Sequence, residues 1–337
     1  MTSKNISRYF RSSTLLDATS SFWASPDCRV RRLPRDEAEE LAIEISRRNV
    51  FARHSGQNNF YVQRMNNLGD QTVIEVFLPG QPSQISEEAE IQADLVERIA
   101  ILSSQLGSSR IKVQQNLGVS RSVTTEVIII GPDVRYVSSR KSQSPEISRV
   151  AVDERFSRRF TRCGMDILFQ HCTSNHSLAQ RTKSSVDWLY QSITDPLISA
   201  SVVKTAIALE SLLILSKSEP LARSLSERSA FLLSSDAETR IRISRLIKKF
   251  YDVRSAVVHG SQKMPVSISN ELLASVERIV ILLCSLISAN AAKWRNSDEL
   301  RDWFEAQRWG RPWEDLTVPY PRTYLSRALD KGEKSSK

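Results

Sequence analysis

The chain contains 337 residues, of which 40% are hydrophobic and 25% are charged, so it is long and apolar enough to bury the cores of two ordinary globular domains. Its ten glycines and twelve prolines exclude a collagen-like or low-complexity chain, and its four scattered cysteines exclude a disulfide scaffold. We therefore expect a globular protein of a reducing compartment, with a cytoplasmic location.

Charge is unevenly distributed along the chain. Residues 1–150 carry 19 Lys and Arg against 17 Asp and Glu, a net charge of +2, whereas residues 151–337 carry 28 against 21, a net charge of +7. A basic half-chain favours a polyanionic partner such as RNA, although a solvated basic surface has the same composition. The longest apolar run, residues 280–292, is shorter than the ~20 residues that a membrane-spanning helix needs, so it predicts a buried core helix and no membrane partner.

Residues 1–34 are rich in Ser and Arg, include the aromatic residues Phe10, Phe22 and Trp23, and show no hydrophobic period. This composition predicts a mobile N-terminal arm. The first sixteen residues are basic and contain no acidic residue, which also fits a transit peptide, whereas no apolar segment of a secretory signal is present.

A small α+β domain is predicted over residues 35–140. A helix over residues 36–48 begins with acidic and ends with basic side chains, which matches the helix dipole. A β-branched run over residues 72–78 ends at a Pro-Gly turn, a second helix follows from Ser86, and residues 123–130 form the strongest strand pattern of the chain. The domain has no Gly-rich phosphate loop, paired-carboxylate motif or nucleophile elbow, so its role stays open.

The second half of the chain is predicted to be helical. Residues 141–152 are polar and contain one proline, which indicates a linker. An all-α domain is expected over residues 153–309, and a C-terminal arm and tail over residues 310–337. The predicted helices cover residues 153–172, 177–194, 197–217, 221–234, 237–259, 268–293 and 297–308.

Arg254 and His259 form the candidate catalytic pair, at the end of a basic amphipathic helix. They are five residues apart, which on a helix is about 7.5 Å of rise and ~140° of rotation, so both side chains can border one groove. Gly260 is a natural helix stop and places His259 in the last turn, where the helix dipole favours an imidazolium. The spacing by itself also fits a surface arginine and a histidine that caps a helix end.

Arginine and histidine together suit the cleavage of an RNA phosphodiester. A guanidinium can hold the phosphate bidentately and stabilise its charge, and an imidazole can move a proton near neutral pH. RNA supplies its own nucleophile, the 2′-OH, so the predicted site requires no metal and no cofactor.

Three segments in order resemble the HEPN superfamily, and specifically its Apea-like branch. They are residues 181–190 (RTKSSVDWLY), 205–213 (TAIALESLL) and 246–260 (LIKKFYDVRSAVVHG), and the resemblance spans roughly a third of the chain. It assigns the family's R-x4-6-H motif to Arg254 and His259. It implies an antiparallel helical bundle that forms a homodimer, with a composite cleft in which the two motifs meet and RNA is cut without metal.

Several neighbours of the pair are predicted to support it. Glu210 and Asp252 are candidate carboxylates that orient His259 or hold Arg254, although for Glu210 a purely structural contact is the favoured interpretation. Ser255 follows the arginine at a position where the family tolerates a polar residue. The predicted RNA-binding residues on the same helix are Arg240, Arg242, Arg245, Lys248 and Lys249.

Three other groups of residues are weighed against simpler explanations. The side chains of Cys163, His171, Cys172 and His176 are of metal-ligating types, but their spacing matches no zinc pattern, so no metal is predicted. A second basic cluster contains Arg158, Arg159 and Arg162, and an ordinary solvated helix face explains it equally well. The four tryptophans at positions 294, 303, 309 and 313 fit a base-stacking platform, but the favoured interpretation is a terminal segment stapled over the core.

The sequence thus predicts an α+β N-terminal domain followed by an all-α HEPN-like helical bundle, mostly α overall. The expected function is a metal-independent endoribonuclease that works as a homodimer, as in family members that serve antiviral defence, with an N-terminal domain that senses a trigger or restrains the nuclease. Because many superfamily members keep the fold without cleavage, the alternative is a non-catalytic module that binds RNA or a protein partner. A further alternative is the toxin of a toxin–antitoxin pair, whose partner is an antitoxin.

Overall fold

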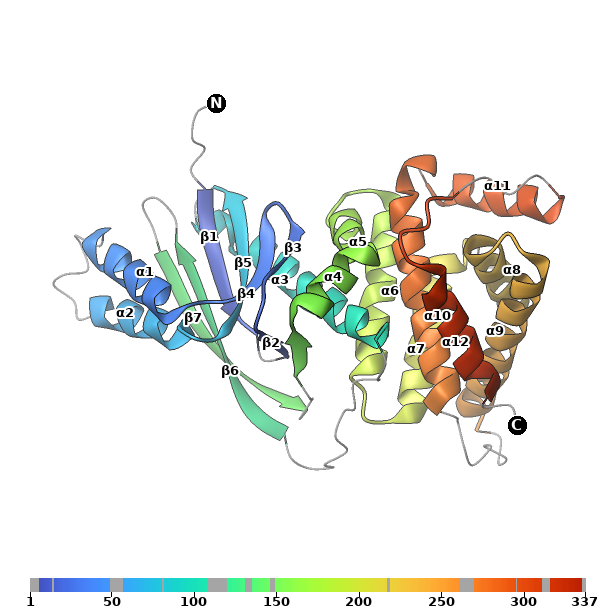
Figure 1. The fold of residues 1–337 in the computed structure, drawn as a ribbon, viewed down its shortest axis with the longest axis horizontal. Coiled ribbons are helices and arrows are strands. Elements are labelled where there is room, and N and C mark those ends of the chain that lie inside the picture. Colours follow the sequence, from blue (N-terminus) through green and yellow to red (C-terminus); the bar gives the residue numbers. More distant parts are fainter. Residues whose placement is uncertain are drawn as a thin grey trace. The chain divides into compact units, whose positions relative to one another are not determined.

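The computed structural model describes residues 6–13, 15–48, 57–80, 82–107, 120–130, 135–145, 149–216, 219–260, 270–294, 296–310 and 316–334. The chain divides into two compact units, residues 1–97 with 114–158 and residues 98–113 with 159–337. The described strands belong to the first unit, and the second unit is built from helices (Figure 1). The predicted order of an α+β part followed by a helical part is confirmed at this level.

The first unit is organised around an antiparallel sheet. In the described residues, its strand order is β3 (Phe22–Ser25), β4 (Cys28–Arg32), β5 (Thr72–Pro79), β1 (Ile6–Ser12), β6 (Ser120–Ile130) and β7 (Arg135–Pro145). Phe10 of β1 lies opposite Glu75 of β5 and Ile128 of β6, so β1 is a central strand. The strands predicted at residues 72–78 and 123–130 are confirmed as β5 and β6.

Two helices, α1 (Arg35–Arg48) and α2 (Gln57–Leu68), pack against part of one sheet face. Phe10, Val73 and Ile128 share that face, because residues that pair across neighbouring strands point to the same side. Ile45 of α1 and Met65 of α2 complete this core and are at most 1% exposed. The helix predicted over residues 36–48 is confirmed as α1, whereas α2 was missed because its sequence is mostly polar.

The prediction of an N-terminal arm over residues 1–34 is wrong in the part that the structure describes. This segment supplies β1, β2 (Leu16–Ala18), β3 and β4. Its strand pattern is hidden because buried positions hold polar residues. Arg11 is only 6% exposed, and its guanidinium binds Asp94 and Glu97 of α3 (Pro82–Gln105), the helix predicted from Ser86.

The predicted linker over residues 141–152 is also wrong where it is described. Strand β7 continues to Pro145, and β8 (Val150–Val152) pairs in parallel with β2, with Leu16 opposite Val150. The partner strand of β8 lies near the start of the chain. No local sequence pattern reports such a distant pairing, and the segment's polar composition resembles a loop.

The second unit is a helical assembly in which the predicted helices are confirmed to within a few residues. Its elements are α4 (Glu154–Arg162, which begins in the first unit), α5 (Met165–Cys172), α6 (Ser177–Ile193), α7 (Ile198–Leu213), α8 (Leu221–Leu233), α9 (Ala237–Val258), α10 (Asn270–Ala289), the short 3-10 helix η2 (Ala291–Lys293), α11 (Ser297–Arg308) and α12 (Arg322–Lys334). The single helix predicted over residues 153–172 is broken at Gly164, whose φ is +65°. A Cβ atom there would lie 2.7 Å from Cβ of Pro319, so the break requires glycine.

Helix α10 lies at the centre of this unit, in contact with α5, α6, α7, α8, α9 and α12. It is apolar and long enough to cross a membrane by composition alone, but 94% of its most hydrophobic window is buried inside the fold. Its buried side chains include Leu273, Val276, Ile279 and Leu283, so it forms the core that the sequence predicts for this segment.

The predicted C-terminal arm is wrong where it is described, because α12 packs against α10 and α9. Leu325, Ala328 and Leu329 form a narrow buried stripe on a helix whose other side chains are largely charged. Gly332 allows close contact with α9, since a Cβ atom there would lie 2.5 Å from Cδ1 of Leu246. The charged composition of this segment indicated disorder, but its apolar stripe is sufficient for docking.

Candidate functional site

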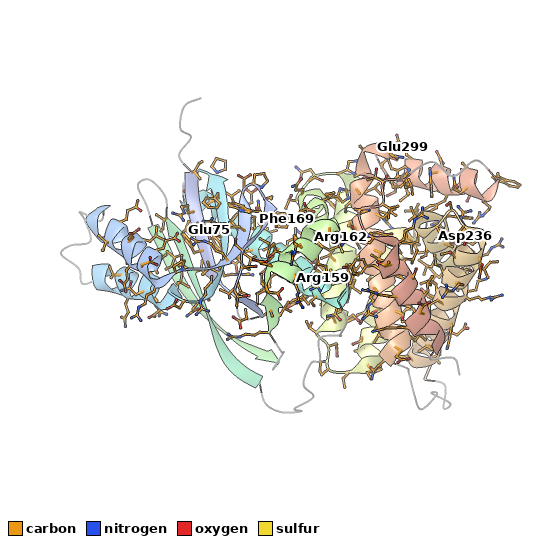
Figure 2. All side chains as sticks on the ribbon, viewed as in Figure 1. Glu75, Arg159, Arg162, Phe169, Asp236 and Glu299 are labelled. Carbon is orange, nitrogen blue, oxygen red and sulfur yellow. The ribbon has the colours of Figure 1, made fainter. Side chains whose placement is uncertain are left out.

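Helix α9 carries the candidate pair and has well-defined ends. Asp236, labelled in Figure 2, is the N-cap residue, and its carboxylate accepts a hydrogen bond from the backbone N–H of Thr239 at 2.7 Å. His259 is the C-cap, and Gly260 follows with a φ of +60°. The glycine therefore ends the helix in the left-handed conformation that the sequence predicts at this position.

The buried face of α9 consists of Ile243, Leu246, Ile247, Phe250 and Tyr251. The exposed positions follow the same helical period on the opposite side and form what we call the α9 exposed stripe: Ile241, Arg245, Lys248, Asp252, Ser255 and His259. The stripe thus places His259 on the same side of the helix as two of the basic residues. Arg254 follows Ile247 and Phe250 at helical spacing and so belongs to the buried face, although 23% of its side chain is exposed.

Arg254 is held against α7 by Glu210. Its Nη2 atom lies 3.7 Å from Oε1 of Glu210, an ion pair without a direct hydrogen bond. The guanidinium also lies over the ring of Tyr251, with 5.6 Å between its carbon and the ring centroid. Its Nε atom is buried and has no hydrogen-bond partner within the described residues. Arg254 is therefore positioned by its neighbours, while among the described residues most of its hydrogen-bonding capacity stays unused.

Glu210 binds two residues of α9 at once. The hydroxyl of Tyr251 donates a hydrogen bond to the Glu210 carboxylate. Burial, and then this carboxylate, raise the pKa of Tyr251 well above its ordinary value, so the phenol stays protonated as a donor. We call Glu210, Tyr251 and Arg254 the α7–α9 triad. Sequence reasoning singled out Glu210 and Arg254 but missed Tyr251, whose only signal was its helical spacing three residues before Arg254.

His259 is exposed, and its backbone N–H donates to the carbonyl of Ser255 at 3.0 Å. With α9 helical up to Val258, Arg254 and His259 are separated by about 7.5 Å along the axis. A single chain therefore places both residues at the same end of α9. No direct interaction between their side chains is found within the described residues. A phosphate group with its neighbouring ribose is large enough to touch both side chains.

The other predicted supporting residues are placed differently. Asp252 and Arg254 are two positions apart, which on a helix is ~200° of rotation, so they lie on nearly opposite sides. Asp252 shares the exposed stripe with His259 but is two turns away from it. Of the two candidate carboxylates, the structure therefore brings only Glu210 to Arg254, and neither is shown in contact with His259 within the described residues.

The predicted RNA-binding residues separate into two groups. Arg240 donates from Nε to the carbonyl of Ser234 at 2.7 Å, and Arg242 pairs with Asp330 of α12 at 2.9 Å, so both participate in packing. Arg245 and Lys248 are exposed on the α9 exposed stripe, and Lys249 is half-buried. Of these residues, the two exposed cations lie on the same stripe as His259, with Asp252 and Ser255 between them and the histidine.

The remaining sequence candidates serve mainly as core contacts. Cys163 and Cys172 are buried, and His171 and His176 approach with 6.0 Å between ring centroids. Figure 2 labels Arg159 and Arg162 of the second basic cluster, of which Arg162 is exposed and Arg159 half-buried.

Two of the four C-terminal tryptophans pack inside the helical unit. Trp294 and Trp303 are buried with 5.6 Å between their ring centroids, as expected of a staple over the core. Trp309 is 85% exposed, and Trp313 lies outside the described residues.

The candidate site thus consists of the α7–α9 triad, which positions Arg254, and of His259 at the exposed end of the same helix. In chemical terms, a guanidinium is able to bind an anion and an exposed imidazole is able to exchange a proton, and the two groups stand at the same end of α9. Neither the family models, nor the curated proteins, nor the solved structures compared with this chain gave a match.

Proposed function

We propose that this chain is a metal-independent endoribonuclease that works as a homodimer, with a HEPN-like helical bundle as its nuclease unit. The observation that supports this most is the pairing of a positioned, half-buried Arg254 with an exposed His259 one and a half turns further along α9. An arginine held in place loses little freedom when a phosphate binds, which favours tight orientation of the scissile group.

In the proposed reaction, His259 takes the proton of the RNA 2′-OH, and the 2′ oxygen forms a bond to the adjacent phosphorus. The bond from phosphorus to the 5′ oxygen breaks, and this oxygen takes a proton from the imidazolium of the partner subunit's His259. The products are a 2′,3′-cyclic phosphate and a 5′-OH. Arg254 stabilises the negative charge that develops on the phosphoryl oxygens.

The test is cleavage of a 5′-labelled mixed RNA pool by the full chain in EDTA. We expect His259→Ala to lower the rate at least about 100-fold, because general acid–base catalysis contributes that much or more, and Arg254→Ala to lower it similarly. Arg223→Ala is the matched control: this arginine of α8 is 69% exposed and far from the pair in sequence, and the rate should stay within twofold.

Equal cleavage by the wild type and His259→Ala would overturn the proposed catalytic pair. One observation favours a second function, a non-catalytic module that binds RNA or a protein partner: within the chain, Arg254 is engaged by an ion pair with Glu210 and by the ring of Tyr251, as in a structural contact. That function predicts no cleavage by any variant, together with weaker RNA binding by Arg254→Ala than by Arg223→Ala.

A further inference from the structure

The sheet of the first unit carries a row of alternating aromatic rings and guanidinium groups. Trp23 of β3 lies opposite Arg29 of β4, which lies opposite Glu75 of β5, which in turn lies opposite Phe10 of β1. These four side chains share one sheet face because residues that pair across strands point to the same side. Arg8 and Phe77 form the neighbouring row on that face.

Each of the two guanidinium groups lies over two aromatic rings. Arg29 lies 5.0 Å from the ring centroid of Trp23 and 5.6 Å from that of Phe77. Arg8 lies 5.6 Å from the Phe77 centroid and 4.9 Å from the Phe10 centroid. The Trp23 and Phe77 rings are themselves stacked, with centroids 6.2 Å apart and 24° between their planes. We call Trp23, Arg29, Phe77 and Arg8 the sheet ladder.

A buried carboxylate, that of Glu75, fixes the arginines of the sheet ladder. Glu75, labelled in Figure 2, is fully buried and accepts hydrogen bonds from Arg8 at 3.0 Å, Arg29 at 2.6 Å and Arg31 at 2.9 Å. Burial opposes its ionisation, but the hydrogen bonds from Arg29 and Arg8 outweigh that effect and lower the pKa of Glu75. With Glu37, which binds Arg31, the cluster holds three cations and two anions and keeps a net positive charge.

The sheet ladder becomes accessible to solvent at β3, the strand at the edge of the sheet. Phe10 is fully buried in the core with α1 and α2, whereas Trp23 at the other end of the row is 46% exposed. Arg8 and Arg29 keep 30% and 24% of their side chains exposed. Arg29 uses only Nε toward Glu75, and its two terminal nitrogens make no hydrogen bond within the described residues. A fixed ring and unused planar donors therefore lie side by side on an accessible face.

We propose that the sheet ladder is a binding surface for single-stranded RNA, separate from the candidate catalytic pair. An exposed tryptophan ring stacks on any nucleobase, and a guanidinium beside it binds the adjacent phosphate bidentately or extends the stack. The net positive charge of the cluster complements a phosphate backbone and does not complement a basic or neutral peptide. Because Glu75 fixes the arginines before binding, little side-chain freedom is lost in the complex.

The experiment measures fluorescence anisotropy of a fluorescein-labelled 12-nucleotide single-stranded RNA, in EDTA, with the full chain carrying His259→Ala in every variant. This background keeps the RNA intact, so that the result does not depend on whether the chain cleaves RNA. Loss of one stacked base corresponds to at least about a fivefold change in Kd. We therefore expect Trp23→Ala to raise Kd by at least that factor.

Two further variants test the chemistry of the surface. Arg29→Lys keeps the charge but removes the planar fork, and we expect Kd to rise at least threefold. Trp309→Ala is the matched control, because this tryptophan is 85% exposed on the helical unit, and Kd should stay within twofold. A circular dichroism melt of each variant confirms that it is folded.

The proposal is overturned if Trp23→Ala and Arg29→Lys both bind as tightly as the parent, or if Trp309→Ala loses as much affinity as Trp23→Ala. It is also overturned if the parent binds no RNA. Where Trp23→Ala does not fold, Arg29→Lys decides by itself. None of these results bears on cleavage, which the His259 and Arg254 variants test separately.

Discussion

At the scale of single residues, Glu75 and His171 show two opposite ways of burying a titratable side chain. Glu75 stays ionised because arginines surround it with hydrogen bonds. His171 is 7% exposed, its Nε2 atom is buried without a hydrogen-bond partner in the described part of the chain, and its ring faces a second histidine. Burial, and then the repulsion from His176, lower the pKa of His171 to about 4, so it is neutral at physiological pH.

The burial of a neutral His171 predicts that the folded chain loses stability in acid. Below pH 6.5 the unfolded chain binds a proton at His171 while the folded chain does not, so the folded state loses stability as the pH falls from about 6.5 to about 4. The loss is about 3 kcal/mol over this window. Urea unfolding at pH 7, 5.5 and 4 should show a shallower dependence on pH in His171→Leu than in the wild type.

His259→Ala serves as the control for this measurement, because that histidine is exposed. A shallower pH dependence in His171→Leu than in His259→Ala assigns the effect to the buried histidine. If the pH dependence is the same in both variants, another group accounts for the acid sensitivity in this window.

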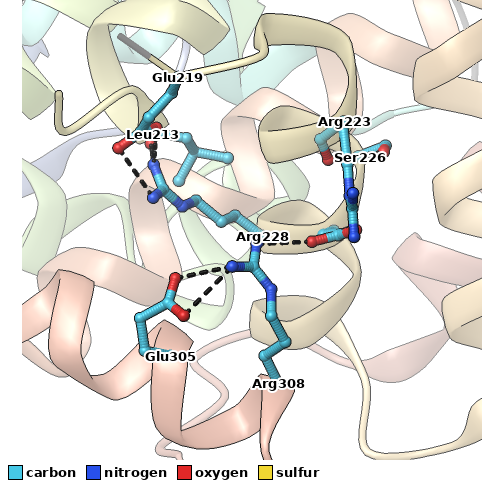
Figure 3. A network of polar contacts seen from close by, with 8 residues as sticks. Leu213, Glu219, Arg223, Ser226, Arg228, Glu305 and Arg308 are labelled. Carbon is cyan, nitrogen blue, oxygen red and sulfur yellow. Dashed lines mark hydrogen bonds and ion pairs between the residues drawn. The ribbon is translucent and has the colours of Figure 1, made fainter. Parts of the chain in front are cut away.

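At the scale of elements, Arg228 of α8 joins three parts of the helical unit (Figure 3). Its guanidinium binds the Glu219 carboxylate with two hydrogen bonds, at 2.6 and 3.0 Å, and donates to the carbonyl of Leu213, the last residue of α7, at 2.6 Å. It also lies 5.2 Å from the ring centroid of Phe304 on α11. Only 5% of the Arg228 side chain is exposed, so these contacts are largely shielded from water.

We therefore expect Arg228→Ala to lower the free energy of unfolding by about 3 kcal/mol, because the substitution leaves a buried carboxylate and a carbonyl without their donor. Arg223→Ala removes an arginine from the same helix, but this side chain is 69% exposed, and its ion pair with Glu227 contributes less than about 1 kcal/mol. Chemical denaturation of both variants measures the difference. Equal effects would show that Arg228 does not connect these helices energetically.

At the scale of the whole molecule, the proposed nuclease needs two copies of the chain. One chain offers one His259 at the candidate site, whereas the proposed reaction uses one histidine to remove a proton and another to donate one. Residues 151–337, which contain most of the helices of the second unit, also carry the larger share of the net positive charge, +7. A dimer would bring two such basic surfaces to one RNA strand.

Light scattering coupled to size exclusion should accordingly give a mass of twice 38.2 kDa for the wild type. His259→Ala should give the same mass, because an exposed side chain at the helix end does not hold the fold together. A monomeric wild type that still cleaves RNA would contradict the composite cleft while leaving the catalytic pair intact.

Much of the helical unit could be predicted from local sequence, because a helix that buries one face repeats its apolar residues every three to four positions. The helices over residues 237–259 and 268–293 show this pattern and were found within a few residues of their ends. The same pattern was weak in α12, where three buried residues among charged ones resemble a disordered tail. Arg254 and His259 were identified from their residue types and from their spacing. Both lie on one helix, so their separation in space follows from local structure.

The sequence by itself determined which segments are helical, where α9 ends and which two side chains stand near that end, because these depend on local periodicity and on Gly260. Only the tertiary structure decided what those residues touch. Glu210 and Tyr251 are 41 positions apart and meet because α7 packs against α9. In the first unit, buried arginines paired with carboxylates take the place of the apolar residues that normally reveal a strand. A long-range ion pair leaves no local pattern, so both the central strand β1 and the sheet ladder became visible only in the folded chain.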